Sequence, residues 1–209
     1  MALRVLVMCM ANICRSPIAE ALLDEGFAEI GIDAEFSSAG FLESGRPIDH
    51  RSATALAERN LDATAHASTQ VNSELVDAAD LVVVMEADHL RRLVSDDPAR
   101  FPRIFTLRGL AGLVAEVGVR QPDESMSDWL TRLNSTRSPR DYLGCGESFD
   151  VSDPYRFGAD GFRVIADEIA ELVGVVVAGA DGRSLPLPDP VDAQSVAKRG
   201  GKRRFWGRS

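Results

Sequence analysis

The chain has 209 residues, of which 45% are hydrophobic and 26% charged, and it carries three cysteines and a formal net charge of −9. The hydrophobic content is too high for a disordered chain, and three cysteines are too few for a disulfide scaffold. No uninterrupted apolar stretch reaches the roughly 18 residues that a membrane span needs. The composition therefore predicts one globular domain. The short apolar run near the start indicates a strand rather than a secretion signal, so we expect a cytoplasmic protein.

The charge is distributed unevenly between the body of the chain and its end. Residues 197–209 contain six cations and no acidic residue, so residues 1–196 hold 17 cations, 32 acidic residues and a net charge of −15. Such an acidic body argues against nucleic-acid binding by the body. The basic end also holds Phe205 and Trp206, and it predicts weak contact with an anionic membrane surface. The alternative is a solvated end that touches the acidic body.

Short apolar runs alternate with segments of helical periodicity along the chain. The predicted strands cover residues 3–8, 34–39, 81–85 and 103–107. The first predicted helix begins at Pro17. The other predicted helices cover residues 49–60, 72–79, 87–94, 110–118 and about 160–177. This alternation predicts a three-layer α/β/α fold with a four-stranded parallel sheet, doubly wound and Rossmann-like.

The second half of the chain contains two stretches without a clear periodic pattern. Residues from about 119 to 148 are polar, and only 126–133 around Trp129 has the pattern of a helical turn. From residue 179 the sequence is rich in Pro and Gly and reads as a linker that leads to the basic end. We therefore predict one domain at residues 1–178 and a disordered segment at 179–209.

The loop between the first strand and the first helix carries the strongest chemical signal. Cys9 and Arg15 are separated by five residues, and Ser16 follows as a predicted helix N-cap. A loop that joins a parallel strand to a helix N-terminus points several backbone N–H groups into one concavity, which binds an anion such as phosphate. An arginine adds a bidentate donor for phosphate oxygens, and the same positive field favours the thiolate of a cysteine. The alternative is a buried strand-end thiol at Cys9 and a surface arginine at Arg15.

Four segments resemble one protein family in sequence order. Residues 7–17, read Val-Met-Cys-Met-Ala-Asn-Ile-Cys-Arg-Ser-Pro, resemble the active-site loop of the low-molecular-weight protein tyrosine phosphatases. Residues 38–40, 79–85 and 151–155 resemble the family's strand-to-variable-loop signature, its central strand and its Asp-Pro-Tyr loop. The resemblance covers about residues 3–178 and implies a protein-tyrosine-phosphatase of that fold, with a phosphate loop between the first strand and the first helix.

The resemblance also implies roles for individual residues. Cys9 would attack phosphorus and become a phosphocysteine, and Asp153 would protonate the leaving phenolate and then activate water. Ser16 would donate a hydrogen bond to the Cys9 thiolate, and Asn12 would fix the loop, since asparagine tolerates left-handed backbone angles. The phosphate ligands and loop residues would be Met10, Ala11, Asn12, Ile13, Cys14 and Arg15, and the walls for the substrate ring would be Tyr155 and Leu42, with Phe41 as the alternative to Leu42.

Three of these assignments have an alternative. Asp153 precedes a proline, where aspartate is a common turn residue, and Asp150 is its nearest rival as the general acid. Cys14 corresponds to the family's second cysteine, which forms a reversible disulfide with the nucleophile and protects it from overoxidation; otherwise it is a small packing residue. Tyr155 is either a wall for the substrate ring or a structural residue.

The sequence departs from the family pattern at the loop and beyond it. Ala11 replaces the usual glycine, and its methyl group would obstruct a left-handed backbone turn. In the family, a threonine at the position of Ile13 goes with protein-arginine phosphatase activity, so Ile13 favours phosphotyrosine. The segment at about 119–148 is longer than the family minimum, which makes it an enlarged loop.

The leading function is thus hydrolysis of phosphotyrosine in a protein. Bacterial members of the family often act opposite tyrosine kinases that control polysaccharide export, so a kinase or export protein of that kind is the expected partner. The alternatives are a protein-arginine phosphatase, an arsenate reductase, for which only Cys145 remains as a further cysteine, and a non-catalytic phosphate-binding module. The histidines His50, His66 and His89 are scattered without ligand spacing, so no metal or cofactor is predicted, and His66 matches a structural histidine of the family.

Overall fold

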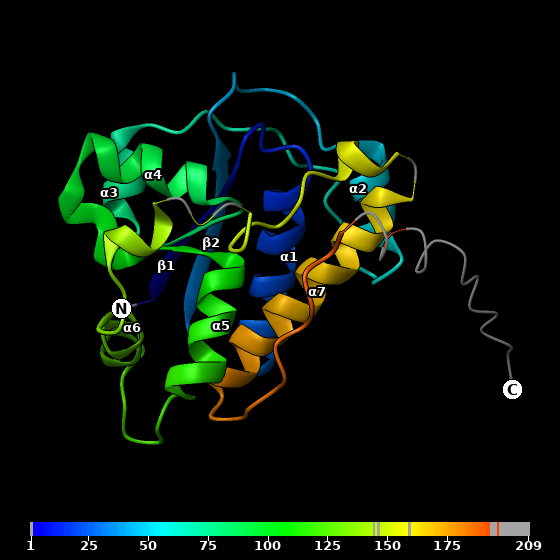
Figure 1. Ribbon diagram of the computed structural model, residues 1–209. Coiled ribbons are helices and arrows are strands. Elements are labelled where there is room, and N and C mark those ends of the chain that lie inside the picture. The colour runs from blue at the N-terminus through cyan, green and yellow to red at the C-terminus, as the bar shows by residue number, and fades with distance from the viewer. Residues whose placement is uncertain (1, 144, 146, 159, 193–195, 197–209) are drawn as a thin grey trace, which may run out of the picture.

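A single parallel sheet of four strands organises the molecule (Figure 1). The computed structural model describes residues 2–143, 145, 147–158, 160–192 and 196, and the structural statements below concern these residues. The strand order is β2-β1-β3-β4, as in a doubly wound sheet. The strands are β1 (Leu3–Cys9), β2 (Ala34–Gly40), β3 (Leu81–Val84) and β4 (Ile104–Thr106).

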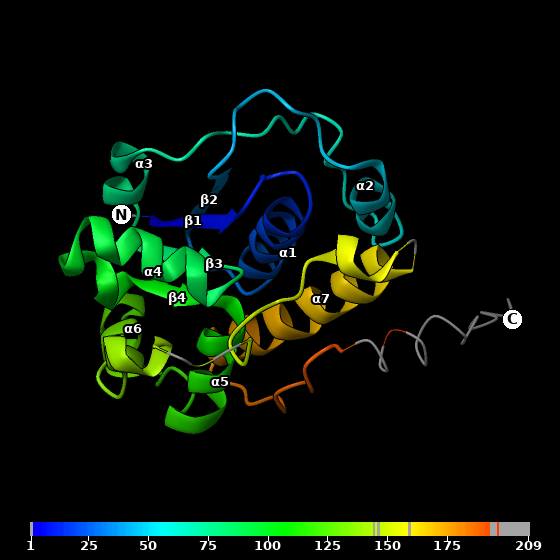
Figure 2. The same ribbon diagram turned by 45° about the horizontal axis from the view of Figure 1, so that its top comes forward.

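Helices cover both faces of this sheet, which confirms the predicted three-layer α/β/α fold (Figures 1 and 2). One face carries α1 (Arg15–Glu29), α2 (His50–Ala57), α5 (Leu107–Val117) and the long α7 (Gly161–Ala180). The other face carries α3 (Ser73–Ala78) and α4 (Ala87–Asp96). A further helix, α6 (Met126–Asn134), packs beside α5, and short 3-10 helices occupy Pro98–Arg103, Pro139–Tyr142 and Pro154–Phe157.

The central strand β1 is buried on both faces because its side chains alternate between two apolar clusters. Val5, Val7 and Cys9 join the cluster under α1 and α7, whereas Leu6 and Met8 join the cluster under α3 and α4. The alternation places the Cys9 side chain on the face of the sheet that α1 covers.

The parallel register brings the carboxyl ends of three strands to one edge. Cys9 pairs with Gly40 of β2, while Met8 pairs with Val84 of β3. The loops that follow these strands therefore meet at this edge, which is where parallel α/β sheets bind their ligands.

Two helices begin earlier than the sequence predicts. The first helix begins at Arg15 and not at Pro17, and its N-cap residue is Cys14. The prediction of Ser16 as N-cap is therefore wrong, because its hydroxyl contacts Cys9 and Asn12 instead. Helix α5 begins at Leu107 because the Thr106 side chain accepts a hydrogen bond from the Gly109 N–H and caps the helix three residues before the predicted start.

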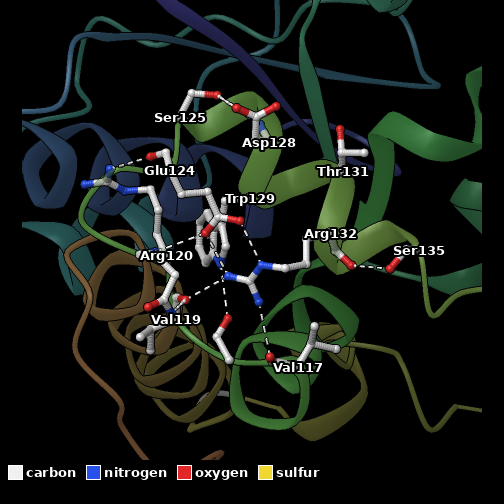
Figure 3. A network of polar contacts seen from close by, with 12 residues as sticks. Val117, Val119, Arg120, Glu124, Ser125, Asp128, Trp129, Thr131, Arg132 and Ser135 are labelled. Carbon is white, nitrogen blue, oxygen red and sulfur yellow. Dashed lines mark hydrogen bonds and ion pairs between the residues drawn. The ribbon is translucent and has the colours of Figure 1, made fainter.

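The predicted enlarged loop contains ordered structure that is tied to the end of α5 (Figure 3). Arg132 donates two hydrogen bonds of 2.8 Å to the Glu124 carboxylate and also donates to the carbonyls of Val117 and Val119. The Trp129 side chain is 1% exposed, and its indole N–H donates to the Gly118 carbonyl at 3.1 Å. These contacts fold the segment back onto the body as α6 and its flanking turns.

Residues that follow α7 also contact the body. The chain turns at Gly182, which has a positive φ of 77°, and Arg108 donates to the Pro188 carbonyl at 3.0 Å. Val191 and Val196 are buried in the cluster under α1 and α7. The domain boundary at residue 178 stays a prediction, although these contacts hold residues beyond it against the body. The basic end at 197–209 lies outside the described residues, and no helix among the described ones is long and apolar enough to cross a membrane.

Candidate active site

The thiol of Cys9 lies at the start of the loop between β1 and α1. Its Sγ is 3.1 Å from Ser16 Oγ and accepts a hydrogen bond from the Asn12 backbone N–H at 3.3 Å. Ser16 Oγ itself accepts from Asn12 Nδ2 at 2.9 Å, so the hydroxyl proton of Ser16 remains available to Cys9 Sγ. Both contacts come from the residues that follow β1, so Cys9 Sγ is held at the base of the loop.

Asn12 connects the loop to β2 and to the connection between α2 and α3. Its backbone φ is 53°, the left-handed conformation that its residue type predicts. Its side chain donates to Ser38 Oγ at 2.8 Å and accepts from the Thr69 N–H at 2.8 Å. Its carbonyl lies 2.7 Å from His66 Nε2, which gives that histidine a structural contact with the loop. These bonds fix the one left-handed residue among those of the loop.

The loop carbonyls are bound from the outside. The Met10 carbonyl accepts from the N–H groups of Phe41 at 2.8 Å and Leu42 at 3.2 Å, and the Ile13 carbonyl accepts from the Asp49 N–H at 2.8 Å. Because the peptide carbonyls bind outward, the loop N–H groups are left for the concave side, as in an anion-binding nest. None of the described residues accepts a hydrogen bond from the backbone N–H groups of Ala11, Ile13 and Cys14.

The substitution of alanine for the family's glycine at position 11 is accommodated by the backbone. Ala11 does not have a positive φ, so its methyl group meets none of the strain of a left-handed turn. The residue packs against a small cluster of Ile13, Cys14 and Phe162. The obstruction considered from the sequence is therefore absent.

Gly40 is the glycine that the loop requires. A Cβ at this position would lie 2.8 Å from the Asn12 N, 2.8 Å from the Met10 O and 3.0 Å from the Ala11 C, all of them backbone atoms. We expect Gly40→Ala to displace the loop, to destabilise the fold by about 1–3 kcal/mol and to lower turnover. The control is Gly174→Ala in α7, where a Cβ meets no atom within 4 Å and should add about 0.5–1 kcal/mol of stability. Urea unfolding measures the stability of both variants, and hydrolysis of an aryl phosphate measures their turnover. Wild-type stability and turnover of Gly40→Ala would show that the loop does not require a glycine at this position.

Arg15 is buried at the start of α1, its side chain only 4% exposed, and is not a surface residue. Its Nη1 donates to Glu86 Oε1 at 2.5 Å and to the Val151 carbonyl at 2.7 Å. Burial works against its charge, but the nearby Cys9, Glu86 and Asp153 together raise the pKa of Arg15, so it stays a cation. Glu86 was not among the predicted site residues, although its position directly after a buried strand at the carboxyl edge was a usable signal.

His89 is a second residue near the loop that the sequence did not single out for the site. It is fully buried, its Nε2 lies 3.8 Å from Glu86 Oε2, and its ring lies 5.3 Å from that of Phe41. Burial lowers the pKa of His89 to about 4, so the ring is neutral at neutral pH and packs against Phe41. Among the residues that the structure describes, no three or more His, Cys, Asp or Glu side chains are grouped to hold a metal ion.

The two aspartates that compete for the role of general acid have different environments. Asp153 accepts from the Tyr155 N–H at 3.0 Å and caps the 3-10 helix Pro154–Phe157, so it does form a turn. Its charge is one of those that raise the pKa of Arg15. Asp150 instead accepts from the Ala87 N–H at 2.7 Å at the start of α4, and burial raises its pKa. The structure therefore gives Asp150 a capping contact, while the catalytic role of Asp153 stays a prediction.

The two predicted walls are exposed side chains on segments that contact the loop. Leu42 is 44% exposed and Tyr155 is 52% exposed. Phe41 is turned toward His89 and the Arg92 guanidinium, so Leu42 is the freer of the two neighbours. Leu42 and Tyr155 are thus available to contact a substrate ring.

None of the three cysteines forms a disulfide in this structure. Cys14 is 6% exposed, and burial raises its pKa to about 11, so it is a thiol at neutral pH. Cys145 is half-buried, with its Sγ 3.9 Å from Arg91 Nη1. Disulfide formation between Cys9 and Cys14 stays a prediction.

Comparison with known proteins assigns the family. Residues 4–133 match the model of the low molecular weight phosphotyrosine protein phosphatases. A low molecular weight protein-tyrosine-phosphatase of Streptomyces coelicolor is 30% identical over 184 residues, which is 86% of this chain and 92% of the relative. The chain therefore belongs to the low molecular weight phosphotyrosine protein phosphatase family, whose members are hydrolases.

Two further relatives define the range of activities and the fold. A protein-arginine-phosphatase of Bacillus subtilis is 33% identical over 171 residues, covering 81% of this chain and 91% of the relative. The solved structure of a low molecular weight protein tyrosine phosphatase from T. tengcongensis has a TM-score of 0.62 and 27% identity, covering 84% of this chain and 98% of that one. The resemblance in sequence and the doubly wound fold are thus confirmed.

Proposed function

We propose that this protein hydrolyses phosphotyrosine in proteins through a phosphocysteine on Cys9. The observation that carries the proposal is the hydrogen bonding of Cys9 Sγ, which the Asn12 N–H and the Ser16 hydroxyl approach at 3.3 and 3.1 Å. A thiolate held by two such donors beside a buried arginine is a prepared nucleophile for a phosphate ester.

In the first step the Cys9 thiolate attacks phosphorus, and the bond between phosphorus and the tyrosine oxygen breaks. The loop N–H groups and Arg15 Nε and Nη2 are the donors that we assign to the three non-bridging oxygens, since the bonds of Arg15 to Glu86 and Val151 both leave from Nη1. Asp153 gives its proton to the leaving oxygen, so that a neutral phenol departs.

In the second step a water molecule attacks the phosphocysteine. Asp153, now a carboxylate, accepts a proton from that water, and the bond between sulfur and phosphorus breaks. Inorganic phosphate leaves, and Cys9 is again a thiolate that the Ser16 hydroxyl and the Asn12 N–H stabilise. No cofactor is needed for either step.

The second candidate activity is hydrolysis of phosphoarginine. The observation that favours it is the similarity to the Bacillus subtilis protein-arginine-phosphatase over most of this chain. Against it stands Ile13, which is 5% exposed in the loop and packs with Cys14 and Phe162. Its branched side chain supplies no polar group to a guanidinium, in keeping with the preference for phosphotyrosine that the family pattern implies.

The test is the release of phosphate from two peptides that differ only in phosphotyrosine or phosphoarginine. We expect kcat/KM for the phosphotyrosine peptide to exceed that for the phosphoarginine peptide by at least tenfold. A preference for phosphoarginine would replace the tyrosine assignment with the second candidate. Failure to cleave either peptide or an aryl phosphate would leave a non-catalytic phosphate-binding module.

The proposed substrates are phosphotyrosine proteins of a bacterial cytoplasm, such as a tyrosine kinase or a polysaccharide-export protein. This proposal is supported by relatives named protein-tyrosine-phosphatase from several bacteria. Weak contact of residues 197–209 with anionic membranes also remains a proposal, supported by the six cations of that segment.

A further inference from the structure

Tyr155 is fixed in position although half of its surface is exposed. Its hydroxyl donates to Asp49 Oδ2 at 2.7 Å, and its ring lies edge-on to Phe162 at 5.0 Å with an interplanar angle of 85°. An exposed tyrosine normally exchanges between rotamers, whereas these two contacts select one orientation.

Asp49 connects that hydroxyl to the phosphate loop itself. Its backbone N–H donates to the Ile13 carbonyl at 2.8 Å, and its side chain, 9% exposed, accepts from the Arg51 N–H at 2.9 Å to cap α2. One residue therefore contacts both the loop that would bind phosphate and the ring that would bind the substrate's aromatic group. The distance between those two subsites depends on Asp49.

Arg51 completes the arrangement by holding the Asp49 carboxylate. Its Nε and Nη2 donate to the two carboxylate oxygens at 2.9 and 2.8 Å, and its guanidinium carbon lies 3.7 Å above the Phe162 ring and 5.0 Å from the Tyr155 ring. A bidentate pair of this kind has a defined geometry. The guanidinium also neutralises a carboxylate that lies beside the loop and would otherwise repel a phosphate dianion.

The geometry points to Asp49 and Arg51 as positioning residues that set the Tyr155 ring at a fixed distance from the phosphate loop and so select aromatic phosphates. A wall that is already in place costs less entropy when a ring binds. The inference rests on the proposed function, because it assigns Tyr155 to the substrate ring of that reaction.

The positioning role of Asp49 and Arg51 can be tested by measuring ligand binding, without any hydrolysis. Calorimetry compares inorganic phosphate, which occupies only the loop, with phenylphosphonate, which also presents a ring, in the wild type, Tyr155→Phe and Asp49→Asn. We expect Tyr155→Phe to weaken phenylphosphonate by about 3- to 10-fold and phosphate by less than 2-fold, because only the bond that fixes the ring is lost.

Asp49→Asn should change the affinities for phenylphosphonate and phosphate differently, whereas a merely structural role would weaken both. Asparagine caps a helix as well as aspartate, so α2 is kept. The negative charge is lost, however, and the amide nitrogen cannot accept the bonds that Asp49 Oδ2 accepts from Arg51 Nη2 and the Tyr155 hydroxyl. We expect about 3- to 10-fold weaker phenylphosphonate binding, with phosphate binding unchanged or tighter. The double variant with Tyr155→Phe should be no weaker for phenylphosphonate than the weaker single variant, since both remove one interaction.

A matched control is Asp97→Asn, which alters another capping aspartate beside an arginine, away from the loop. Asp97 accepts from the Ala99 N–H at 2.9 Å and lies 3.8 Å from Arg100 Nε. It should leave both affinities unchanged. The inference is overturned if Tyr155→Phe has the same ratio of phenylphosphonate to phosphate affinity as the wild type. It is also overturned if Asp49→Asn weakens the binding of both ligands equally. Ligand binding as expected without hydrolysis by the wild type would instead overturn the proposed function alone.

Discussion

Cys9→Ser is expected to lower the rate of aryl phosphate hydrolysis by roughly 10⁴-fold or more. A serine hydroxyl at this position is a proton-bearing, weak nucleophile, and the loop holds no general base to remove that proton. Phosphate binding should persist, because the loop N–H groups and Arg15 are unchanged. Steady-state hydrolysis of p-nitrophenyl phosphate measures the first effect, and a phosphate titration by calorimetry measures the second.

Cys145→Ser is the matched control for the loss of a thiol. Its half-buried sulfur contacts Arg91, away from the bonds that hold Cys9. This variant should keep wild-type turnover. Full activity of Cys9→Ser would exclude the phosphocysteine route, and loss of activity in Cys145→Ser would revive a mechanism that uses a further cysteine.

Asp153→Asn is expected to reduce kcat for a phosphotyrosine peptide by about 10²- to 10⁴-fold. Asparagine retains an oxygen that accepts from the Tyr155 N–H, so the turn at 154–157 is preserved while the proton donor is lost. The loss should be smaller with p-nitrophenyl phosphate, because its leaving group departs more readily without a proton. Comparing the two substrates in one variant separates acid catalysis from a change in structure.

The corresponding change at the rival residue is Asp150→Asn. Asparagine at this position still accepts from the Ala87 N–H, so α4 keeps its cap. We expect kcat to change by less than threefold with either substrate. A large, leaving-group-dependent loss in Asp150→Asn with little effect in Asp153→Asn would reverse the assignment of the acid.

The parts of the fold that the sequence predicted are those determined by local pattern. The central strands β1 and β3 are continuous apolar runs, and both lie where that pattern placed them. The predicted start of α1 was wrong because serine before a proline is a typical N-cap residue, which placed the N-cap at Ser16. In the structure the Ser16 hydroxyl contacts Cys9 Sγ and does not cap the helix. A residue that serves a site departs from the role that its local sequence favours.

The site residues likewise fall into those that a local sequence pattern predicts and those that only the fold brings together. The loop from Cys9 to Ser16 is contiguous, so its spacing shows the cluster directly. Glu86 lies 71 residues from Arg15, and Asp49 lies 106 residues from Tyr155, so no local pattern joins either pair. These contacts exist only because the parallel sheet brings its carboxyl ends to one edge.

The outward hydrogen bonds of the loop carbonyls have a consequence for cooperativity. The partners at Phe41, Asp49 and His66 come from one long connection between β2 and α3, and they meet the loop only when that connection is folded. Local opening of residues 41–66 would release the loop and abolish its affinity for anions. Phosphate should therefore slow amide hydrogen exchange across this whole connection as well as in the loop, so that residues of the connection that do not touch phosphate report on ligand occupancy.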